Sequence, residues 1–363
     1  NKLFLGDWTL MADLSSSSAR GKLHDAYLFS GLADGGFTTV GFNTPAAFGY
    51  PHFTPGVDLA DPTTMVFTDP GSPWSDPPGY GYNGRDEFDH QDDTIHAFRL
   101  QASHPLGWIF SDMDVGLAWS DRTKTKHADV YFAYLNGNGS TKDTYQAHLS
   151  APVDPAMLYH PTSLGYGGID GILNYDVLGA LYGGQFYRVQ KNGQGDWSRN
   201  YTVEEKVPLA YVKFNLDTHL GSVPLRGNVG VQFVRTKQSS RALQTNGDAL
   251  VGNISDGASY NNVLPSLNLV AEIGERQYLR LGLAKSMARG RIDDEKVATS
   301  ASVSQITNGP GAGQVLWSGR GGNPQLRPYV AVGTDLSWEK YFGKASYVAA
   351  AVFHKNLLNY IYN

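Results

Sequence analysis

Aromatic and acidic side chains gather in long stretches of the chain that lack a regular hydrophobic pattern, chiefly residues 17–91, 124–200 and 290–327. Flat aromatic faces beside Asp, Asn and Arg groups suit sugars, because sugar C–H faces stack on rings while hydroxyls bond to the polar groups. We expect the substrate-binding side chains to be Trp74, Tyr80, Tyr82, Asp89, His90, Tyr166, Trp197, Arg199, Trp317 and Arg320. The competing interpretation is that these rings pack on one another as the core of the loops.

Few patterns point to catalysis or to a metal. The acidic run 86–93 offers oxygen ligands for Ca²⁺, but its spacing is not that of an EF-hand loop and its middle has no glycine, which favours a solvated acidic loop. His90, His96 and His104 have the spacing of neither a zinc ribbon nor a helical zinc site. The sequence contains no Gly-x-Ser-x-Gly elbow and no P-loop. We therefore predict no catalytic residue, no metal, no cofactor and no enzyme.

The elements that must position these stretches are pairs of long alternating strands. In residues 201–220, the apolar side chains from Ala210 to Leu216 alternate with more polar ones, which is the period of two of a β-strand. Residues 223–238 follow the same pattern after a very short connection, so the two segments predict a hairpin. Two further hairpins are predicted, pairing 262–272 with 277–289 and 328–341 with 345–357.

The connections between the strands are of two kinds. Strands 92–103 and 111–123 form an earlier pair, and a single strand over 5–16 precedes them, which gives about nine long strands in all. The short turns are 104–110, 219–223, 273–276 and 342–344, and the long excursions are 17–91, 124–200, 239–260 and 290–327. This asymmetry is typical of an outer-membrane barrel, and the arms exceed the roughly 9–11 residues that cross a bilayer. We predict an all-β chain folded as a transmembrane antiparallel β-barrel.

In such a barrel the polar positions of the strands face inward. They are predicted to line the lumen and to hold a plug by hydrogen bonds. These positions are Lys213, Asn215, Asp217, Asn228, Gln232 and Arg280. The segment 323–328, Asn-Pro-Gln-Leu-Arg-Pro, is predicted to lead from a loop into a strand, because its prolines fix φ and remove backbone donors.

Composition agrees with a barrel. The 363 residues include 42 Gly and 21 Tyr but no Cys, and no linker or change of composition divides them. The mean hydropathy of −0.32 is too polar for a helical membrane protein, whereas a barrel conceals its apolar residues by alternation. The longest apolar run, residues 347–353, is too short for a spanning helix. A net charge of −5 with scattered basic residues gives no sign of nucleic-acid binding.

Several short segments resemble, in order and spacing, the landmarks of TonB-dependent outer-membrane receptors. They are Tyr201–Lys206, Val223–Val231, Val263–Leu269, Gly322–Pro328, Trp338–Phe342 and Val352–Leu357. Their combination is similar to the branch common in Caulobacter- and Xanthomonas-like bacteria, many of whose members are associated with carbohydrate uptake. The resemblance covers residues 200–358 well, and 1–20 and 90–126 less closely.

The resemblance implies the outer membrane of a Gram-negative bacterium and a barrel of about 22 strands closed by a plug. This sequence lacks a plug, a TonB box and the last strands of such a barrel, so we expect residues 1–363 to be part of one barrel domain. The implied partners are TonB with ExbB and ExbD, a small solute, and outer-membrane lipid with lipopolysaccharide. No nucleic-acid partner is expected.

The function predicted on this basis is TonB-dependent active uptake of a scarce solute. The aromatic and acidic loops favour a neutral oligosaccharide. A ferric siderophore, often anionic, would be better served by clustered basic residues, and it stays open through Arg199, Arg289, Arg291 and Arg320. A passive porin shares the strand pattern but would carry charged rings around an open pore. A secreted β-rich enzyme or adhesin would have polar outward strand faces instead.

Overall fold

The computed structural model describes most of the chain. The described residues are 2–33, 36–44, 49–69, 81–137, 150–190, 192–247, 249–306, 310–343 and 345–361. They form two compact units. The first comprises Asn1–Gly21, Gln91–His127 and Trp197–Asn363, and the second comprises Lys22–His90 and Ala128–Asp196.

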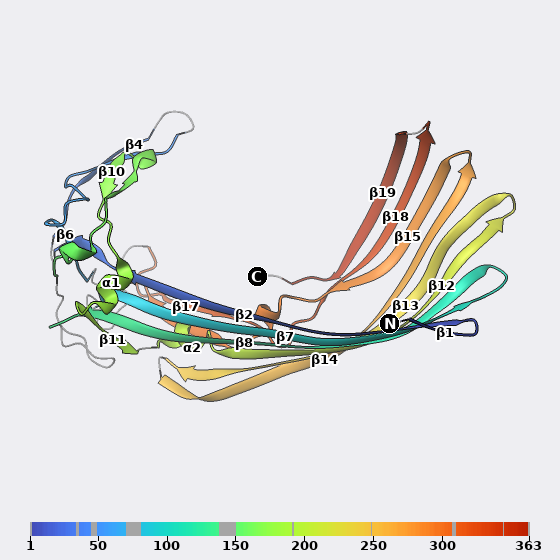
Figure 1. The fold of residues 1–363 in the computed structure, drawn as a ribbon, viewed down its shortest axis with the longest axis horizontal. Coiled ribbons are helices and arrows are strands. Elements are labelled where there is room, and N and C mark those ends of the chain that lie inside the picture. Colours follow the sequence, from blue (N-terminus) through green and yellow to red (C-terminus); the bar gives the residue numbers. More distant parts are fainter. Residues whose placement is uncertain are drawn as a thin grey trace. The chain divides into compact units, whose positions relative to one another are not determined.

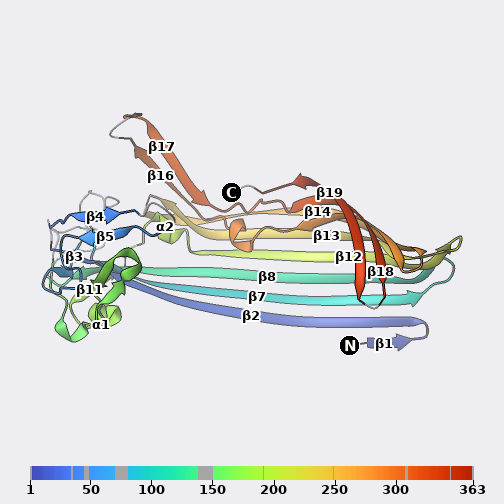
Figure 2. The same ribbon diagram turned by 90° about the horizontal axis from the view of Figure 1, so that it is seen from above.

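One antiparallel sheet contains the long strands, which run side by side in Figures 1 and 2. In spatial order the strands along this sheet are the short β1 (Lys2–Leu5) and the long β2 (Trp8–Leu28), β7 (Gly84–Pro105), β8 (Phe110–Leu135), β12 (Tyr201–Leu220), β13 (Val223–Asn246), β14 (Ala249–Gly274), β15 (Gln277–Ala288), β18 (Tyr329–Phe342) and β19 (Ser346–Asn359). A shorter strand, β11 (Phe186–Gln190), also pairs with β8. Neighbouring long strands are mostly consecutive along the chain, which is the hairpin order that the sequence predicts.

The pairing register separates polar from apolar side chains. Across β12 and β13, Lys213 lies opposite Gly230 and Asn215 lies opposite Asn228, so these positions share one face. The intervening Val212 and Phe214 lie on the other face. We call the first the polar face and the second the apolar face. Gly221, with φ +62°, makes the tight connection between the two strands, because that backbone conformation is rarely open to other residues.

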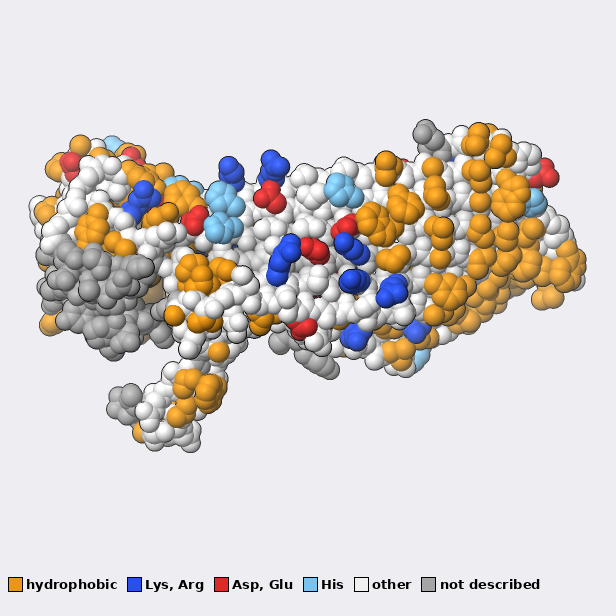
Figure 3. All heavy atoms as spheres, turned by 90° about the horizontal axis from the view of Figure 1, so that it is seen from below, with side chains coloured by type: hydrophobic (Ala, Val, Ile, Leu, Met, Phe, Trp, Pro, Cys, Tyr) orange, Lys and Arg blue, Asp and Glu red, His pale blue; other side chains and the backbone are white. Residues whose placement is uncertain are grey.

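The apolar face carries a belt next to the short turns. On β12 every position of this face from Pro208 to Leu216 is apolar, and on β13 the positions from Leu225 to Phe233 are apolar or glycine. Each run extends over a length of strand that matches the roughly 9–11 residues needed to cross a bilayer. We call these runs, with their neighbours on β8, β14 and β15, the apolar belt. Figure 3 shows apolar side chains gathered at one end of this face and most charged side chains beside them.

Two stretches that the sequence assigns to loops belong to strands in the structure. The stretch 239–260 is not a loop, because β13 and β14 remain paired up to Asn246 and Ala249. The acidic run 86–93 is not a solvated loop either, since β7 begins at Gly84 and includes it. Beyond the apolar belt the apolar face carries polar side chains such as Lys206, Arg235 and Lys237, so the alternation that reveals a strand disappears from the sequence while the backbone pairing continues.

The N-terminal segment also differs from the prediction. It is a hairpin rather than one strand over 5–16, because Leu5 of β1 pairs with Trp8 of β2. Gly6, at φ +59°, allows the turn between them. The nine long strands that the sequence predicts are all present in the described sheet, and β1 is a short strand added to its N-terminal edge.

The second unit has a small core of its own. Three two-stranded sheets join β3 (Ser30–Leu32) to β6 (Met65–Phe67), β4 (Val40–Asn43) to β5 (His52–Pro55) and β9 (Thr162–Leu164) to β10 (Ile169–Ile172). Phe67 is fully buried against Phe186 and Leu181, and Leu181 comes from the helix α1 (Val177–Tyr182). A second short helix is α2 (Gln194–Trp197). No helix in the described residues has both the length and the apolar character needed to cross a membrane.

The facing of the strands predicts how β15 tolerates a charge. Leu281 lies on the apolar face between Leu269 and Leu336. If this level is mid-bilayer, Leu281→Arg should lower the free energy of unfolding by about 2–4 kcal/mol, measured by urea unfolding in lipid vesicles. Gly282 is the matched control, since it lies on the polar face beside Asn268 and Asp335. Equal tolerance of Arg at positions 281 and 282 would contradict this assignment of the faces.

Candidate functional site

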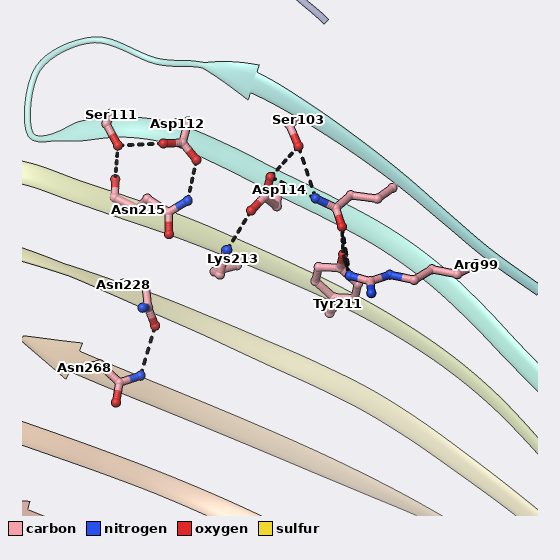
Figure 4. Close-up of polar contacts among 11 residues, drawn as sticks. Arg99, Ser103, Ser111, Asp112, Asp114, Tyr211, Lys213, Asn215, Asn228 and Asn268 are labelled. Carbon is pink, nitrogen blue, oxygen red and sulfur yellow. Dashed lines mark hydrogen bonds and ion pairs between the residues drawn. The ribbon is translucent and has the colours of Figure 1, made fainter. Parts of the chain in front are cut away.

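The polar face near the short turns carries a network of paired side chains (Figure 4). Lys213 Nζ on β12 lies 2.7 Å from Asp114 Oδ2 on β8. The Ser103 hydroxyl of β7 donates to the other oxygen of Asp114 at 2.5 Å. Side chains of three consecutive strands thus meet at Asp114. One of its oxygens pairs with the Lys213 ammonium, and the other accepts a hydrogen bond from the neutral Ser103 hydroxyl.

Tyr211 extends this network along the face. Its hydroxyl donates to Gln101 Oε1 at 2.8 Å and accepts from Arg99 Nη2 at 3.2 Å. The ring crosses β8 at Gly116, where a Cβ atom would overlap it, so the glycine is needed for this close approach. Beside the ring lies a hollow of about 440 Å³, lined in part by Lys213 and Gln232.

The six side chains predicted to face a lumen lie together on the polar face. Asn215 donates to Asp112, and Asn268 Nδ2 donates to Asn228 Oδ1 at 3.0 Å. The remaining contacts of the set are the pair of Asp217 with Arg226 at 3.3 Å, the pair of Arg280 with Glu339 at 2.9 Å, and the place of Gln232 opposite Tyr211. Their role against a plug stays a prediction, but the shared face agrees with it.

Further from the turns, the polar face is covered by a segment that the sequence analysis assigns to a loop. Residues 289–298, which include the short helix η3 (Ile292–Glu295), pack there together with residues 322–328. We call these two segments the clasp. Its two arms are joined by the Asn323 N–H, which donates to the Asp294 carbonyl at 2.7 Å. Ile292, Val297 and Ala298 bury themselves against Tyr201, Val203 and Ala242 of the sheet.

Charged groups fix the clasp to the sheet at Asp293. Lys124 Nζ of β8 lies 2.7 Å from Asp293 Oδ1, and the Tyr201 hydroxyl of β12 donates to the same oxygen at 2.8 Å. Burial would raise the pKa of this carboxyl, but the hydrogen bonds from Lys124 and Tyr201 outweigh it and hold the pKa below its usual value. Asp293 is therefore ionised, and it ties η3 to two strands.

A buried glutamine holds the other arm of the clasp. Gln238 Nε2 on β13 donates to the Pro324 carbonyl at 2.8 Å and to the Leu326 carbonyl at 2.9 Å. The Asn-Pro-Gln-Leu-Arg-Pro segment thus leads into β18 as predicted, but it does so while bonded to the polar face. Sequence reasoning missed Gln238, because nothing in its own strand distinguishes it from the other polar residues that alternate there.

Two carboxyl groups meet beneath the clasp. Glu295 of η3 and Glu205 of β12 are both buried, and Arg289 Nε lies 3.6 Å from Glu205 Oε1. Arg289 therefore faces a carboxylate of the sheet and is engaged inside the fold. Burial, to which the charge of Glu205 adds, raises the pKa of Glu295 to about 8. Glu295 is mainly protonated at neutral pH.

The second unit uses several of its aromatic side chains for packing. Tyr82, a predicted binding residue, is stacked on Phe132 with ring centroids 4.4 Å apart. Asp86 is fully buried and accepts hydrogen bonds from the Tyr182 hydroxyl at 2.7 Å and from Arg188 Nη1 at 2.5 Å. Sequence reasoning missed Asp86, because an acidic run gives no sign that one of its carboxylates is buried against α1 and β11.

Other rings of the second unit remain open to solvent. Tyr166, just after β9, is 68% exposed, and it meets the equally open Tyr50 edge-on at 6.0 Å. Asp89 and His90 are half-buried on β7. Of the predicted tyrosine rings that the structure describes in this unit, Tyr82 and Tyr166, the second is thus the more accessible.

The remaining predicted binding residues belong to the first unit or lie outside the described residues. Trp317, which is 78% exposed, and Arg320 are on β17 (Val315–Gly321), which forms a hairpin with β16 (Thr299–Gln305). The register puts Trp317 on one face of this hairpin and Arg320 on the other. Trp197 and Arg199 are half-buried at the end of α2. Trp74 and Tyr80 fall outside the described residues.

The clasp predicts a large effect at Gln238. In the variant Gln238→Leu two carbonyls lose their donor, so the free energy of unfolding should fall by about 2 kcal/mol, and residues 322–328 should become sensitive to protease. Urea unfolding and limited proteolysis of the purified protein measure both effects. Gln244→Leu, at an exposed position of the same strand, is the control. Similar results for the two variants would contradict the anchoring role.

Glu295 predicts a pH dependence. A carboxyl group whose pKa is raised by folding binds its proton more tightly in the folded chain. Stability should therefore fall as pH rises from the ordinary value of 4.5 towards about 8. Glu295→Gln keeps this position neutral, so its melting temperature should exceed that of the unaltered protein increasingly over this range. Glu275→Gln in an exposed turn is the control. A variant that follows the unaltered protein at every pH would refute this account.

Comparison with known proteins supplies the family. Residues 25–363 match the family described as TonB dependent receptor-like, beta-barrel, whereas no curated protein matches the chain. A solved structure with some similarity is that of a mutant ferric enterobactin receptor from Pseudomonas aeruginosa in complex with enterobactin. The likeness has 13% identity and a TM-score of 0.25, and it covers 75% of this chain but 43% of that chain. It carries no argument about the solute. Because the family match covers most of the sequence, this chain belongs to the TonB-dependent receptor β-barrel family, which confirms the predicted fold class.

Proposed function

We propose that the protein takes up a scarce solute across the outer membrane by TonB-dependent transport. In this proposal the apolar belt meets lipid and the polar face lines the lumen. A plug closes the lumen, and TonB with ExbB and ExbD moves it. Binding shifts the receptor towards a state that the energised partner can open, so no covalent bond is made or broken.

For the solute we propose a neutral oligosaccharide. The observation that carries this proposal is the exposure of aromatic rings in the segments away from the short turns. Trp317 on the β16–β17 hairpin is 78% exposed and Tyr166 in the second unit is 68% exposed. Exposed apolar ring surface is unfavourable in water, so a ligand that covers it gains free energy, and sugar C–H faces are suited to do so.

Several basic side chains of these segments are already paired with carboxylates, which supports a neutral solute, although Arg291 and Arg320 are exposed. Arg188 is paired with Asp86, and Arg85 lies 2.8 Å from both Glu87 and Asp196. Arg289 faces Glu205 in the clasp. A guanidinium that is already neutralised by a carboxylate attracts an anion weakly, which disfavours an anionic ferric siderophore.

The face of the β16–β17 hairpin opposite Trp317 offers hydrogen-bond donors for sugar hydroxyls. On the face opposite Trp317 the hairpin carries Ser300 and Ser304 together with Arg320. Hydroxyl and guanidinium groups donate hydrogen bonds to sugar hydroxyls, whereas the Trp317 face offers stacking. One exposed hairpin thereby presents both kinds of contact that a carbohydrate uses, on its two sides.

Uptake measured in cells distinguishes the candidate functions. Cells that express the complete receptor are given labelled neutral oligosaccharides or a ferric siderophore, with or without functional TonB. Oligosaccharide uptake that requires TonB supports the proposal. Siderophore uptake alone would assign the receptor to iron, and uptake that is independent of TonB would indicate a passive porin.

The aromatic platform predicts a defined loss of affinity. Removal of the ring in Trp317→Ala should weaken binding of the transported oligosaccharide about three- to tenfold, because one stacking contact is lost. Calorimetric titration of the purified receptor measures this. Trp108→Ala is the control, since Trp108 is 91% exposed but lies in a short turn between β7 and β8. If both variants bind the sugar as the unaltered receptor does, the β16–β17 hairpin is not part of the binding site.

A further inference from the structure

Two lysines lie directly opposite each other on the apolar face, just beyond the apolar belt. Lys206 of β12 pairs in register with Lys237 of β13, and both are exposed. Like charges at directly opposed positions destabilise a sheet. The arrangement is therefore unfavourable unless an anion lies between the two ammonium groups.

The surroundings increase the positive charge. Arg235 is the next residue of β13 on this face and is also exposed. Asp121 Oδ2 lies 3.6 Å from Lys206, but Glu204 is already paired with Arg241 at 2.9 Å. Among the described residues, neither Arg235 nor Lys237 has an ion-pair partner. Three cations thus face one nearby carboxylate.

Neutral donors border these cations on the next strand. Lys237 lies opposite Ser259 of β14, and Arg235 lies opposite Asn261. A hydroxyl and an amide can each donate a hydrogen bond to an oxygen that the cations attract. We call the group of Lys206, Arg235, Lys237, Ser259 and Asn261 the cationic patch.

The level of the cationic patch indicates the source of the anion. Along β12, in the direction away from the short turns, the last apolar position of this face is Pro208 and the next position is Lys206. On β13 the apolar run ends at Phe233, and Arg235 follows it. If the apolar belt spans the hydrocarbon layer, the cationic patch lies at the headgroup level, on the side away from the short turns. Figure 3 shows charged side chains beside the apolar area on this face.

We propose that the cationic patch binds the phosphate group of a lipid headgroup in the outer leaflet. A phosphate carries enough charge and acceptor oxygens to bridge Lys206 and Lys237, which turns their mutual repulsion into attraction. Arg235 presents a second cationic group to the same headgroup or to its neighbour. This contact concerns the lipid side of the wall, so it does not depend on which solute is transported.

Lipid binding by the purified complete receptor tests the proposal. The detergent-solubilised protein is titrated with diphosphoryl lipid A, and bound lipid is counted by native mass spectrometry. The double variant Arg235→Gln with Lys237→Gln should bind at least about tenfold more weakly, since two charge-assisted contacts are lost. Lys340→Gln is the matched control, because Lys340 lies on the same face of β18 beside the short turn, and it should bind normally.

Two further arms distinguish the source of the phosphate and a merely structural effect. Dephosphorylated lipid A should bind weakly, and millimolar inorganic phosphate should compete poorly, because it lacks the acyl chains that hold a headgroup at this level. In lipid-free detergent the single variant Lys237→Gln should melt no lower than the unaltered protein, since it removes a repulsion. Full binding by the double variant, full binding of dephosphorylated lipid, or equal competition by free phosphate would overturn the proposal.

Discussion

The backbone hydrogen bonds between neighbouring strands are the interaction on which the rest of this structure depends. In lipid an unpaired N–H or C=O group costs several kcal/mol, so a crossing strand cannot end within the bilayer. In this chain β13 and β14 remain paired from Leu225 and Ala271 to Asn246 and Ala249, far beyond the apolar belt. Up to the register shift between Gln244 and Thr245, this ladder fixes the alternation of side chains, and it thereby assigns each paired residue to the polar or the apolar face.

Because side chains alternate along the strands, the polar ones lie together on the polar face, where they need hydrogen-bond or ion-pair partners. The structure provides those partners in two ways. Near the short turns they come from adjacent strands, as with Lys213 and Asp114. Beneath the clasp they come from residues distant in sequence, as with Gln238 and the carbonyls of residues 324 and 326. Buried polar groups left without partners would destabilise the sheet, so the excursion that carries the β16–β17 hairpin is fixed at its base rather than left as an independent loop.

The sequence predicts those features that depend on neighbours along one strand or one turn. The turns at 219–223 and 342–344 and the common face of Lys213, Asn228 and Arg280 follow from alternation, because a period of two survives wherever one face is apolar. Beyond the apolar belt that contrast is lost, and the strands through 239–260 could not be recognised. The clasp and the burial of Asp86 and Glu295 depend on contacts between distant segments, for which the local sequence carries no signal.

The two regions of the polar face differ in how firmly they hold what lies on them. Near the turns the cationic partners are open, with side-chain exposures of 40% for Lys213 and 44% for Arg280, whereas Asp114 is buried. Ion pairs with an exposed partner are worth about 1 kcal/mol, so water or another protein surface can replace the cations more easily than it could replace groups that are buried throughout. Under the clasp, the side chains of Glu205, Gln238 and Glu295 are almost wholly buried, and their release would expose apolar side chains as well. Under the proposed transport mechanism, an element that must move would therefore be better placed against the first region. The second region would hold the base of the β16–β17 hairpin still while that movement occurs.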